Sequence, residues 1–520
     1  MRVVLRPSVV LLTAALVMAV PTLDGDRVGV QAGIPAPTLL RYPYVQQVTM
    51  TSALVVWTTS EDGTSEVRFG TDSSPGSTVV ATSQQFIEPE IPDEVARTYY
   101  VHVAELSGLQ PGETYGYTVL SGGIDLTSAD SLSFRTDSGP SDPTLSLLVF
   151  GDSGTGVPNQ LGIRDAMSGR DFDLAIHTGD IAYVSGTYRQ LEDNFFAVYK
   201  DLAARTPFFP SLGNHGYLTL RGQPYLDVFY LPENAVRPVH KERYYSFDYG
   251  PVHFVALDTE IWAGFFFWGQ LAFDNMLTWL EDDLAATEQP WKFVYFHRPP
   301  YSSSNVPVAY DPRKIVQVLE QYDVDLVLDG HDHVYARTLP LKDGQAELIG
   351  EGGIVYVTTG GGGAGKHLCE PRPFTASCLR RYHFLDLSIN NDCQLSYDVV
   401  GFRQEVIETF ELDRCDPDSD GDSYTDAAEA QAGSDPLDPS STPPTPTPTP
   451  FPSLVNIGDA NCDGTIDSID AAIVLQNTAQ LLTFLPCSLF ADVNRDGRIN
   501  SVDAALILQF SAGLISTLPP

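Results

Sequence analysis

Polar side chains with metal-binding chemistry follow several apolar stretches of this chain. Asp180 and Tyr183 come directly after the apolar residues 174–176, in the segment DLAIHTGDIAYVSG. Because the carboxyl ends of the strands in an open α/β sheet meet at one edge, polar residues there are candidates for a site. The same plan recurs further along the chain, at Asp152, at Asn214 and His215, at His297, and at His331 and His333.

Together these side chains could serve as the ligands of two metal ions that share one bridging carboxylate. Each motif alone is weak evidence of a metal site. A Gly-Asp pair after a strand usually forms a turn, and a single histidine such as His297 usually has a structural role. GHDH is more specific, since His331 and His333 stand two positions apart on an extended segment. The ordered set GDxG, GDxxY, GNH, H and GHxH between residues 151 and 333 makes scattered turn residues a poor explanation.

The elements that must position these loops are expected in residues 144–411, where strand and helix signals alternate. This alternation predicts an αββα sandwich with the strand-end loops on one polar rim. Asp311 and Pro312 begin an amphipathic run, which predicts a helix with Asp at the N-cap and Pro at N1. YYSFDYGPVHFVALDTE predicts two strands joined at Gly250, and GGIVYVTTGGGG predicts a strand that ends in a glycine loop.

Residues 38–137 contain short alternating segments such as SALVVWTT and TYGYTVLSG, which predict a β-sandwich. The segment LQPGETYGY resembles the corner of a fibronectin type III-like sandwich, with Trp57 in its core. A binding module is one interpretation of this domain. We favour a domain that packs against the catalytic one, because no motif here suggests catalysis.

The first residues have the pattern of a secretory signal peptide. Arg2 and Arg6 precede an apolar run over residues 9–20, which is shorter than the roughly 18 residues of a membrane span. We assign residues 1–32 to the signal peptide and leave open whether cleavage falls after Ala19 or near Ala32. No later segment is apolar enough to span a bilayer, so the sequence predicts a secreted protein without a membrane span.

Charge and cysteine content agree with export. The formal net charge of −37 argues against nucleic-acid binding, which needs a basic surface. The six cysteines permit disulfides, although spacing does not fix their connectivity. The local pairs we expect are Cys369/Cys378, Cys393/Cys415 and Cys462/Cys487.

Composition changes after Leu412. Residues 412–435 contain DSDGDSYTDAAE, which places oxygen side chains at the offsets of a calcium loop and resembles a thrombospondin type 3-like repeat. Its candidate ligands are Asp418, Asp420, Asp422, Asp426 and Glu429. The alternative is a solvated acidic linker. Residues 436–453 form a Pro/Thr-rich linker that cannot bury a core.

Residues 454–517 contain an internal repeat. DANCDGTIDSID and DVNRDGRINSVD align at a spacing of 33 residues, and an apolar helical run follows each. Oxygen side chains at offsets 1, 3, 5, 9 and 12, with Gly at 6, are typical of a Ca²⁺ loop. The candidate calcium residues are Asp459, Asn461, Asp463, Thr465, Asp467 and Asp470 in the first loop, and Asp492, Asn494, Asp496, Arg498, Asn500 and Asp503 in the second.

Two family resemblances follow from these motifs. GDSG, GDIAY, GNHG, FHRPPY and GHDHVYAR look like the five metal motifs of the purple acid phosphatase branch of the metallophosphoesterase family, over about residues 40–411. The repeat closely resembles a dockerin, the module that docks enzymes onto cohesin-bearing scaffolds. That second resemblance implies a small all-α calcium-binding module with a cohesin partner. It also implies that the module selects its cohesin through the residues Ser468, Ile469, Ser501 and Val502.

The first resemblance implies a dinuclear metal site bridged by Asp180. One metal, iron in that family, would be held by Asp152, Asp180, Tyr183 and His333. The other, a divalent Zn²⁺, Mn²⁺ or Fe²⁺ ion, would be held by Asp180, Asn214, His297 and His331. The donor chemistry agrees, because a phenolate and carboxylates are hard donors suited to Fe³⁺, whereas imidazoles with amide and carboxylate oxygens suit those divalent ions.

His215, beside Asn214, would protonate the leaving oxygen as a general acid. The chain departs from the family at Gly216, where an acidic residue is usual, and at Val306 and Pro307, where some members have histidines. We interpret His177 as a packing residue near the site. The histidines that fit no ligand spacing are expected to be structural or exposed: His102, His240, His253, His367 and His383.

The sequence thus predicts a secreted acid phosphatase that hydrolyses phosphate monoesters and is tethered outside the cell to a cohesin-bearing scaffold. A phosphodiesterase that uses the same site is one alternative. Another is a catalytically inactive, calcium-dependent binding protein. The complete set of ligand types argues against inactivity, because a drifting site would be expected to lose ligands.

Overall fold

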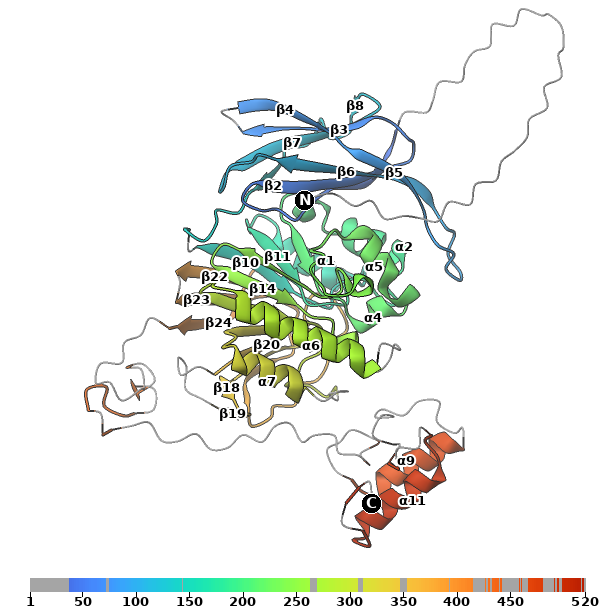
Figure 1. The fold of residues 1–520 in the computed structure, drawn as a ribbon, viewed down its shortest axis with the longest axis vertical. Helices are drawn as coiled ribbons and strands as arrows, with labels where there is room; N and C mark the ends of the chain where they lie inside the picture. The colour runs from blue at the N-terminus through green and yellow to red at the C-terminus, as the bar shows by residue number, and fades with distance from the viewer. Residues whose placement is uncertain are drawn as a thin grey trace, which may run out of the picture. The chain divides into compact units, whose positions relative to one another are not determined.

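The computed structural model (Figure 1) describes residues 37–518 except for 72–73, 143, 262–268, 307–311, 347–352, 392, 415–425, 427–428, 431–432, 439, 442–457, 459, 461–465, 480–490, 492, 495–497 and 516. The predicted signal peptide and most of the Pro/Thr linker therefore lie outside the described residues. No helix within the described ranges has both the length and the apolar composition needed to cross a membrane.

The N-terminal domain consists of two antiparallel sheets. One has the order β1 (Leu39–Gln46), β2 (Ser52–Thr59), β6 (Thr98–Ser107), β5 (Thr82–Ile87). The other runs β4 (Ser74–Val80), β3 (Ser65–Thr71), β7 (Thr114–Ser121), β8 (Ile124–Asp125), and β9 (Leu132–Arg135) also pairs with β7. The predicted core residue Trp57 is fully buried, and its Nε1 donates to Ser121 Oγ at 3.3 Å. The fibronectin type III-like assignment stays a prediction.

This domain packs directly on the next one. The Tyr44 hydroxyl donates to the Val228 carbonyl at 2.6 Å, and the Tyr117 hydroxyl donates to the Ala204 carbonyl at 2.6 Å. Tyr44 is also part of the buried apolar cluster of that next domain. These contacts support the interpretation of residues 38–137 as a packing domain.

The next domain contains two larger sheets. The first has the order β12 (Phe208–Pro210), β11 (Leu174–His177), β10 (Leu145–Phe150), β22 (Phe384–Asn391), β23 (Gln394–Val400), β24 (Val406–Asp413). The second has the order β13 (Tyr245–Tyr249), β14 (Val252–Ala256), β15 (Trp291–Tyr295), β16 (Leu326–Asp329), β20 (Val355–Thr359), β17 (Tyr335–Thr338), β21 (Thr375–Leu379). The two strands predicted around Gly250 and the strand before the glycine loop are confirmed.

Parallel pairing brings the strand ends of each sheet to one edge. β10, β11 and β12 are parallel neighbours, and so are β14, β15, β16 and β20. Strands β14, β16 and β20 of the second sheet are buried on both faces, as parallel strands usually are. In β16, Leu326 and Leu328 join the core shared with the first sheet, whereas Val327 faces the opposite core.

Helices α6 (Gly269–Ala286) and α7 (Arg313–Gln321) supply the opposite core, in which Phe273, Leu280 and Leu319 pack with Val327 (Figure 1). The predicted N-cap of α7 is wrong by one residue, because the helix is capped by Pro312. Helix α1 (Pro158–Met167) has Pro at N1 and buries Ile163 in the core of the first sheet. The remaining elements of this domain are α2 (Tyr188–Leu191), η1 (Glu192–Phe196), α3 (Lys200–Ala203), α4 (Asn214–Tyr217), η2 (Leu220–Gly222), α5 (Gln223–Val228), η3 (Pro238–His240), η4 (Thr259–Ile261), β18 (Leu341–Lys342) and β19 (Gln345–Ala346).

The C-terminal repeat forms two equivalent helices, α9 (Ser468–Thr478) and α11 (Ser501–Ser511). Each begins with a capping box, in which Asp467 or Asn500 accepts a hydrogen bond from the first turn and the N3 aspartate bonds back. Val474 and Ile507 are fully buried in a small shared core. The internal sequence repeat is therefore also a structural repeat.

One predicted disulfide, Cys369–Cys378, is present. Cys393 is disulfide-bonded as well. Its predicted partner Cys415 lies outside the described residues, as do Cys462 and Cys487.

Candidate metal centre

Five loops at the ends of parallel strands carry the predicted metal ligands. Asp152 follows β10, Asp180 and Tyr183 follow β11, and Asn214 follows β12. His297 follows β15, and His331 and His333 follow β16, so both sheets contribute. Close packing of these loops excludes larger residues, because a Cβ atom added at Gly213 would overlap the Asp180 carboxylate.

Three of these residues have left-handed backbone conformations. The φ angles are 55° at Asp152, 50° at Asp180 and 66° at His331. Such conformations are uncommon outside glycine and cost free energy, so they persist where surrounding structure imposes them, often at functional sites.

The first donor group surrounds the Tyr183 hydroxyl. That oxygen lies 2.9 Å from Asp152 Oδ1, 3.3 Å from Asp180 Oδ2 and 3.2 Å from His333 Nε2. Burial, followed by the charges of Asp152 and Asp180, raises the pKa of the Tyr183 phenol well above its usual value. Two buried carboxylates and a half-buried phenol held this close together are the donor set that a highly charged cation would stabilise.

The second donor group surrounds His297 Nε2. This nitrogen lies 3.2 Å from Asp180 Oδ2 and 3.1 Å from Asn214 Oδ1, and the ring centroid is 5.1 Å from that of His331. Burial lowers the pKa of His297, but the Asp180 carboxylate outweighs burial and raises it to about 9. A fully buried imidazole with two oxygen donors beside it suits a divalent transition metal.

Asp180 belongs to both groups. Its Oδ2 faces Tyr183 and His297, whereas its Oδ1 accepts a hydrogen bond from the His215 amide at 2.9 Å. Ligand atoms of Asp152, Asp180 and His297 lie within 4.8 Å of one another. The structure therefore places one carboxylate between two sets of donors.

Backbone carbonyls orient the imidazole rings. His297 Nδ1 donates to the Thr178 carbonyl at 2.9 Å, and His333 Nδ1 donates to the Gly365 carbonyl at 2.6 Å. Because a carbonyl only accepts, Nδ1 carries the proton of each neutral ring, and Nε2 is the nitrogen directed at the donor groups. Such bonds fix the tautomer and orientation of metal-binding histidines.

His215 lies at the open side of the donor groups. Its Nδ1 donates to the Val184 carbonyl at 2.5 Å, its Nε2 is 3.9 Å from Asp180 Oδ2, and its side chain is 31% exposed. The ring centroid lies 4.5 Å from that of Tyr183. This position suits contact with a bound substrate more than metal ligation.

Arg298 and Glu260 also reach the site, and sequence reasoning missed both. Arg298 binds Glu260 through two hydrogen bonds of 2.5 and 3.2 Å, and its Nη1 is 3.1 Å from His331 Nε2. Arg298 is visible in the FHRPPY motif. Its partner lies 38 residues earlier, so no local pattern could pair them.

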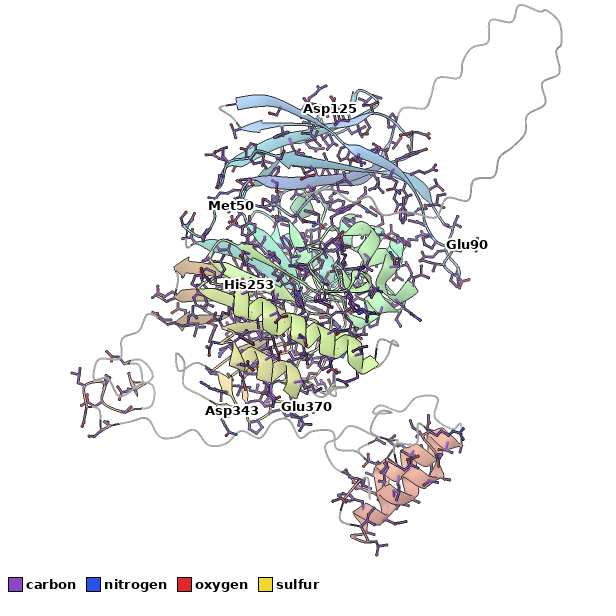
Figure 2. The ribbon with its side chains drawn as sticks, viewed as in Figure 1. Met50, Glu90, Asp125, His253, Asp343 and Glu370 are labelled. Carbon is purple, nitrogen blue, oxygen red and sulfur yellow. A yellow bond between two sulfur atoms is a disulfide. The ribbon has the colours of Figure 1, made fainter. Side chains whose placement is uncertain are left out.

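Of the histidines that were not predicted as ligands, His177 and His253 make contacts away from the donor groups, whereas His367 contacts a predicted ligand. His177 is buried with Nε2 2.9 Å from Ser153 Oγ, as expected of a packing residue, and His253 (Figure 2) lies between Asp248 and Asp283. His367 is a structural residue of a particular kind, because its ring stacks on that of His333 with centroids 4.0 Å apart. Spacing did not reveal it, since His367 lies on a separate glycine-rich loop.

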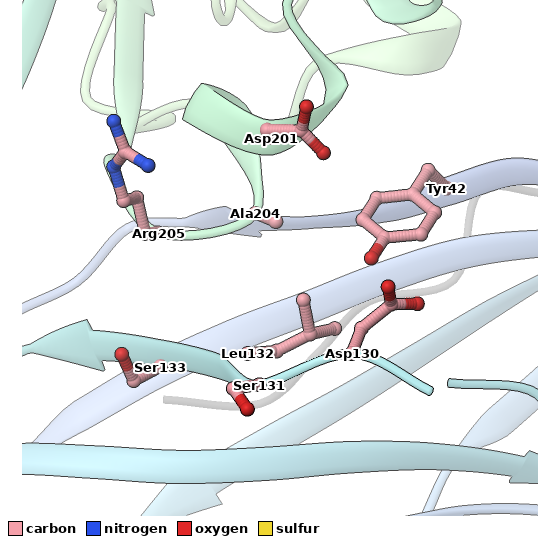
Figure 3. A pocket seen from close by; sticks show the side chains of 8 residues that line it. All are labelled: Tyr42, Asp130, Ser131, Leu132, Ser133, Asp201, Ala204 and Arg205. Carbon is pink, nitrogen blue, oxygen red and sulfur yellow. The ribbon is translucent and has the colours of Figure 1, made fainter. Parts of the chain in front are cut away.

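A pocket of about 200 Å³ lies elsewhere, between the N-terminal domain and the segment around α3 (Figure 3). It is lined by Tyr42, Asp130, Ser131, Leu132, Ser133, Asp201, Ala204 and Arg205. Because this lining contains none of the predicted metal ligands, the pocket is separate from the candidate metal centre.

The predicted partner-binding residues occupy equivalent positions in the repeat. Ser468 and Ile469 begin α9, and Ser501 and Val502 begin α11. Ile469 is 55% exposed and Val502 is 52% exposed, although both are apolar. Exposed apolar side chains at matching positions are suited to protein contact.

The calcium loops are described only in part. Asp470 and Asp503 are fully buried, and Asp503 Oδ1 accepts from the Val493 amide at 2.9 Å. Asp426 and Glu429 are described, as are Asp467, Asn494, Arg498 and Asn500. The predicted ligands outside the described residues are Asp418, Asp420, Asp422, Asp459, Asn461, Asp463, Thr465, Asp492 and Asp496.

Four segments match known protein families. Residues 145–335 match the calcineurin-like phosphoesterase family, and residues 42–136 match the purple acid phosphatase N-terminal domain. Residues 457–510 match the dockerin type I domain, and residues 418–439 match the bacterial TSP3 repeat.

Individual proteins match over much of the chain. Acid phosphatase type 7 of Mus musculus is 28% identical over 387 residues, which covers 68% of this chain and 85% of the relative. Probable inactive purple acid phosphatase 9 of Arabidopsis thaliana is 27% identical over 322 residues, 52% of this chain and 48% of the relative. The structure of purple acid phosphatase PPD1 from yellow lupin (Lupinus luteus) seeds is 21% identical, covers 73% of this chain and 74% of its own, and has a TM-score of 0.62, which shows a shared fold.

Proposed function

We propose that this chain, which carries a purple acid phosphatase N-terminal domain, a metallophosphoesterase domain and a dockerin domain, is a secreted dinuclear acid phosphatase acting on phosphate monoesters. The observation that carries the proposal is the position of Asp180. One buried carboxylate lies within 3.3 Å of Tyr183 on one side and of His297 on the other. Such an arrangement is suited to two cations rather than one.

The donor chemistry divides between the two ions. Asp152, Asp180, Tyr183 and His333 would hold Fe³⁺, because phenolate and carboxylate oxygens are hard donors. Asp180, Asn214, His297 and His331 would hold Zn²⁺, Mn²⁺ or Fe²⁺. When bound, the two cations would neutralise the phosphoryl group and acidify water for attack on phosphorus.

The protein's own contribution includes orientation and proton transfer. The Thr178 and Gly365 carbonyls hold the His297 and His333 rings, so that little reorganisation is needed when a substrate binds. His215, held by the Val184 carbonyl, presents Nε2 at the exposed side of the site and would protonate the leaving oxygen.

The other domains define where this activity is used. A dockerin implies a cohesin partner and bound Ca²⁺, and it suggests attachment to an extracellular scaffold. We propose secretion through the signal peptide at 1–32, catalysis in 144–411 against a fibronectin type III-like domain at 38–137, and docking through 454–517. The segments at 412–435 and 436–453 would be a calcium-binding repeat and an extended spacer.

Turnover of nitrophenyl phosphate and bis-nitrophenyl phosphate by the intact chain, together with metal analysis, tests this proposal. We expect hydrolysis of the monoester to dominate and to depend on both ions. Faster turnover of the diester would favour the phosphodiesterase alternative. Absence of turnover of either ester by a metal-replete chain would favour the catalytically inactive binding protein.

A further inference from the structure

The loop after β20 wraps around the first donor group. This loop, residues 360–370, begins with the Gly362 amide bonded to the Gly151 carbonyl at 3.0 Å and the Ala364 amide bonded to the Asp152 carbonyl at 2.9 Å. It then supplies the Gly365 carbonyl to His333 Nδ1. One loop therefore fixes the backbone at Asp152 and the ring of His333.

His367 completes this arrangement through a closed pair of hydrogen bonds with His333. The His333 amide donates to His367 Nδ1 at 3.0 Å, and the His367 amide donates to the His333 carbonyl at 3.2 Å. The two rings stack with centroids 4.0 Å apart and an interplanar angle of 13°. Because its Nδ1 accepts from an amide, His367 faces His333 with a lone pair and a flat ring surface.

The position of His367 is itself fixed by several anchors. Arg380 Nε donates to the His367 carbonyl at 3.0 Å, and the Cys369–Cys378 disulfide closes the segment two residues later. The Glu370 amide donates to the Ser303 carbonyl at 2.8 Å, which ties the loop to the chain just after the His297 motif. A hydrogen bond from a side chain, a disulfide and a backbone hydrogen bond therefore hold the segment around His367 in place.

We infer that His367 is a positioning residue for the metal centre, which holds His333 in place as a ligand, and that the Cys369–Cys378 disulfide maintains it there. This inference rests on the proposed dinuclear function. Residues that orient metal ligands usually change metal affinity or activity by about 10–100-fold when replaced. We expect a change of that size for the ion bound by Tyr183 and His333, with a smaller effect on the second ion.

The experiment uses the intact chain and measures iron retention against a chelator together with the visible absorption expected of an Fe³⁺–phenolate pair. His367→Ala is expected to weaken iron retention about 10–100-fold and to change the absorption band. His367→Asn keeps a hydrogen-bond acceptor and His367→Phe keeps the stacked ring, so each should restore part of the retention. Cys369→Ser/Cys378→Ser should shift retention in the same direction as His367→Ala.

His253→Gln is the matched control, because His253 is also a buried histidine of this domain with two hydrogen-bond partners but lies outside the metal centre. It should retain iron as the unaltered chain does. Equal retention by the His367 variants and the unaltered chain would overturn the inference. If His367→Ala fails to fold, the Asn and Phe variants decide by the same comparison. An unaltered chain that binds no iron would instead overturn the proposed iron assignment.

Discussion

In the catalytic domain, donor side chains come from five loops between Asp152 and His333, whereas each C-terminal repeat takes its predicted donors from twelve consecutive residues. The sheets and their shared core hold the first set, since Leu147, Phe293 and Leu328 are fully buried beneath those loops. The repeat has only a small core around Val474 and Ile507. The first site is thus built by tertiary packing, whereas we expect the second to depend on its ion.

This difference predicts unequal responses to loss of a ligand. Asp180→Asn replaces the carboxylate shared by both donor groups while the sheets remain packed. We expect the loss of at least one transition metal and of all measurable turnover, with an unchanged far-ultraviolet circular dichroism spectrum. Full metal content and activity in this variant would show that Asp180 is not a bridge.

The second prediction concerns the proton donor of the same centre. His215→Ala should keep both metals and lose about 10²–10⁴ in rate, the usual contribution of a general acid. The deficit should shrink for esters whose leaving group needs no proton. Metal loss in His215→Ala comparable to that in Asp180→Asn would contradict the acid role.

The third prediction concerns calcium. The loops gather several acidic side chains, and without Ca²⁺ their repulsion should exceed what the small core of α9 and α11 can offset. Removing calcium from the intact chain should therefore unfold residues 454–517 and end cohesin binding. Turnover of nitrophenyl phosphate should stay unchanged if a chelator selective for calcium is used. Loss of turnover together with cohesin binding would show that the catalytic domain and residues 454–517 are coupled.

The fourth prediction concerns partner choice on the two equivalent helices. Exchanging Ser468 and Ile469 together with Ser501 and Val502 should change cohesin preference without changing calcium affinity. Because a repeat presents two similar faces, exchanging one pair alone is expected to leave the cohesin preference unchanged. Calorimetry with calcium and with cohesin separates the two effects.

The smallest expected effect comes from His253, which lies outside both sites. Burial lowers its pKa, but hydrogen bonds to Asp248 and Asp283 outweigh burial and raise it from 6.5 to about 9. A raised pKa in the folded state means stabilisation that is complete below pH 6.5 and lost as pH rises to about 9. His253→Gln should remove this part of the pH dependence of unfolding, as measured by thermal denaturation in that window.

Local patterns sufficed to select the side chains that the structure brings together, because each stands at the end of an apolar strand within a recognisable motif. Parallel strand pairing then placed Asp152 beside Asp180, and packing of the two sheets on their shared core brought His297 to them. Arg298 with Glu260, and His333 with His367, could not be paired from sequence because tertiary packing alone joins these separated segments. The start of α7 was predicted one residue too early. Sequence patterns locate a helix end only to within one or two residues, because the end depends on the local backbone geometry.

The central claim is that two metal ions share the Asp180 carboxylate. Its most direct test is the transition-metal content of the intact chain, measured together with the turnover of nitrophenyl phosphate. Two transition-metal ions per chain are expected, one of them iron, in addition to calcium in the repeat. Tyr183→Phe should then remove the visible absorption of the oxidised protein. An active chain with a single transition-metal ion would contradict the dinuclear account.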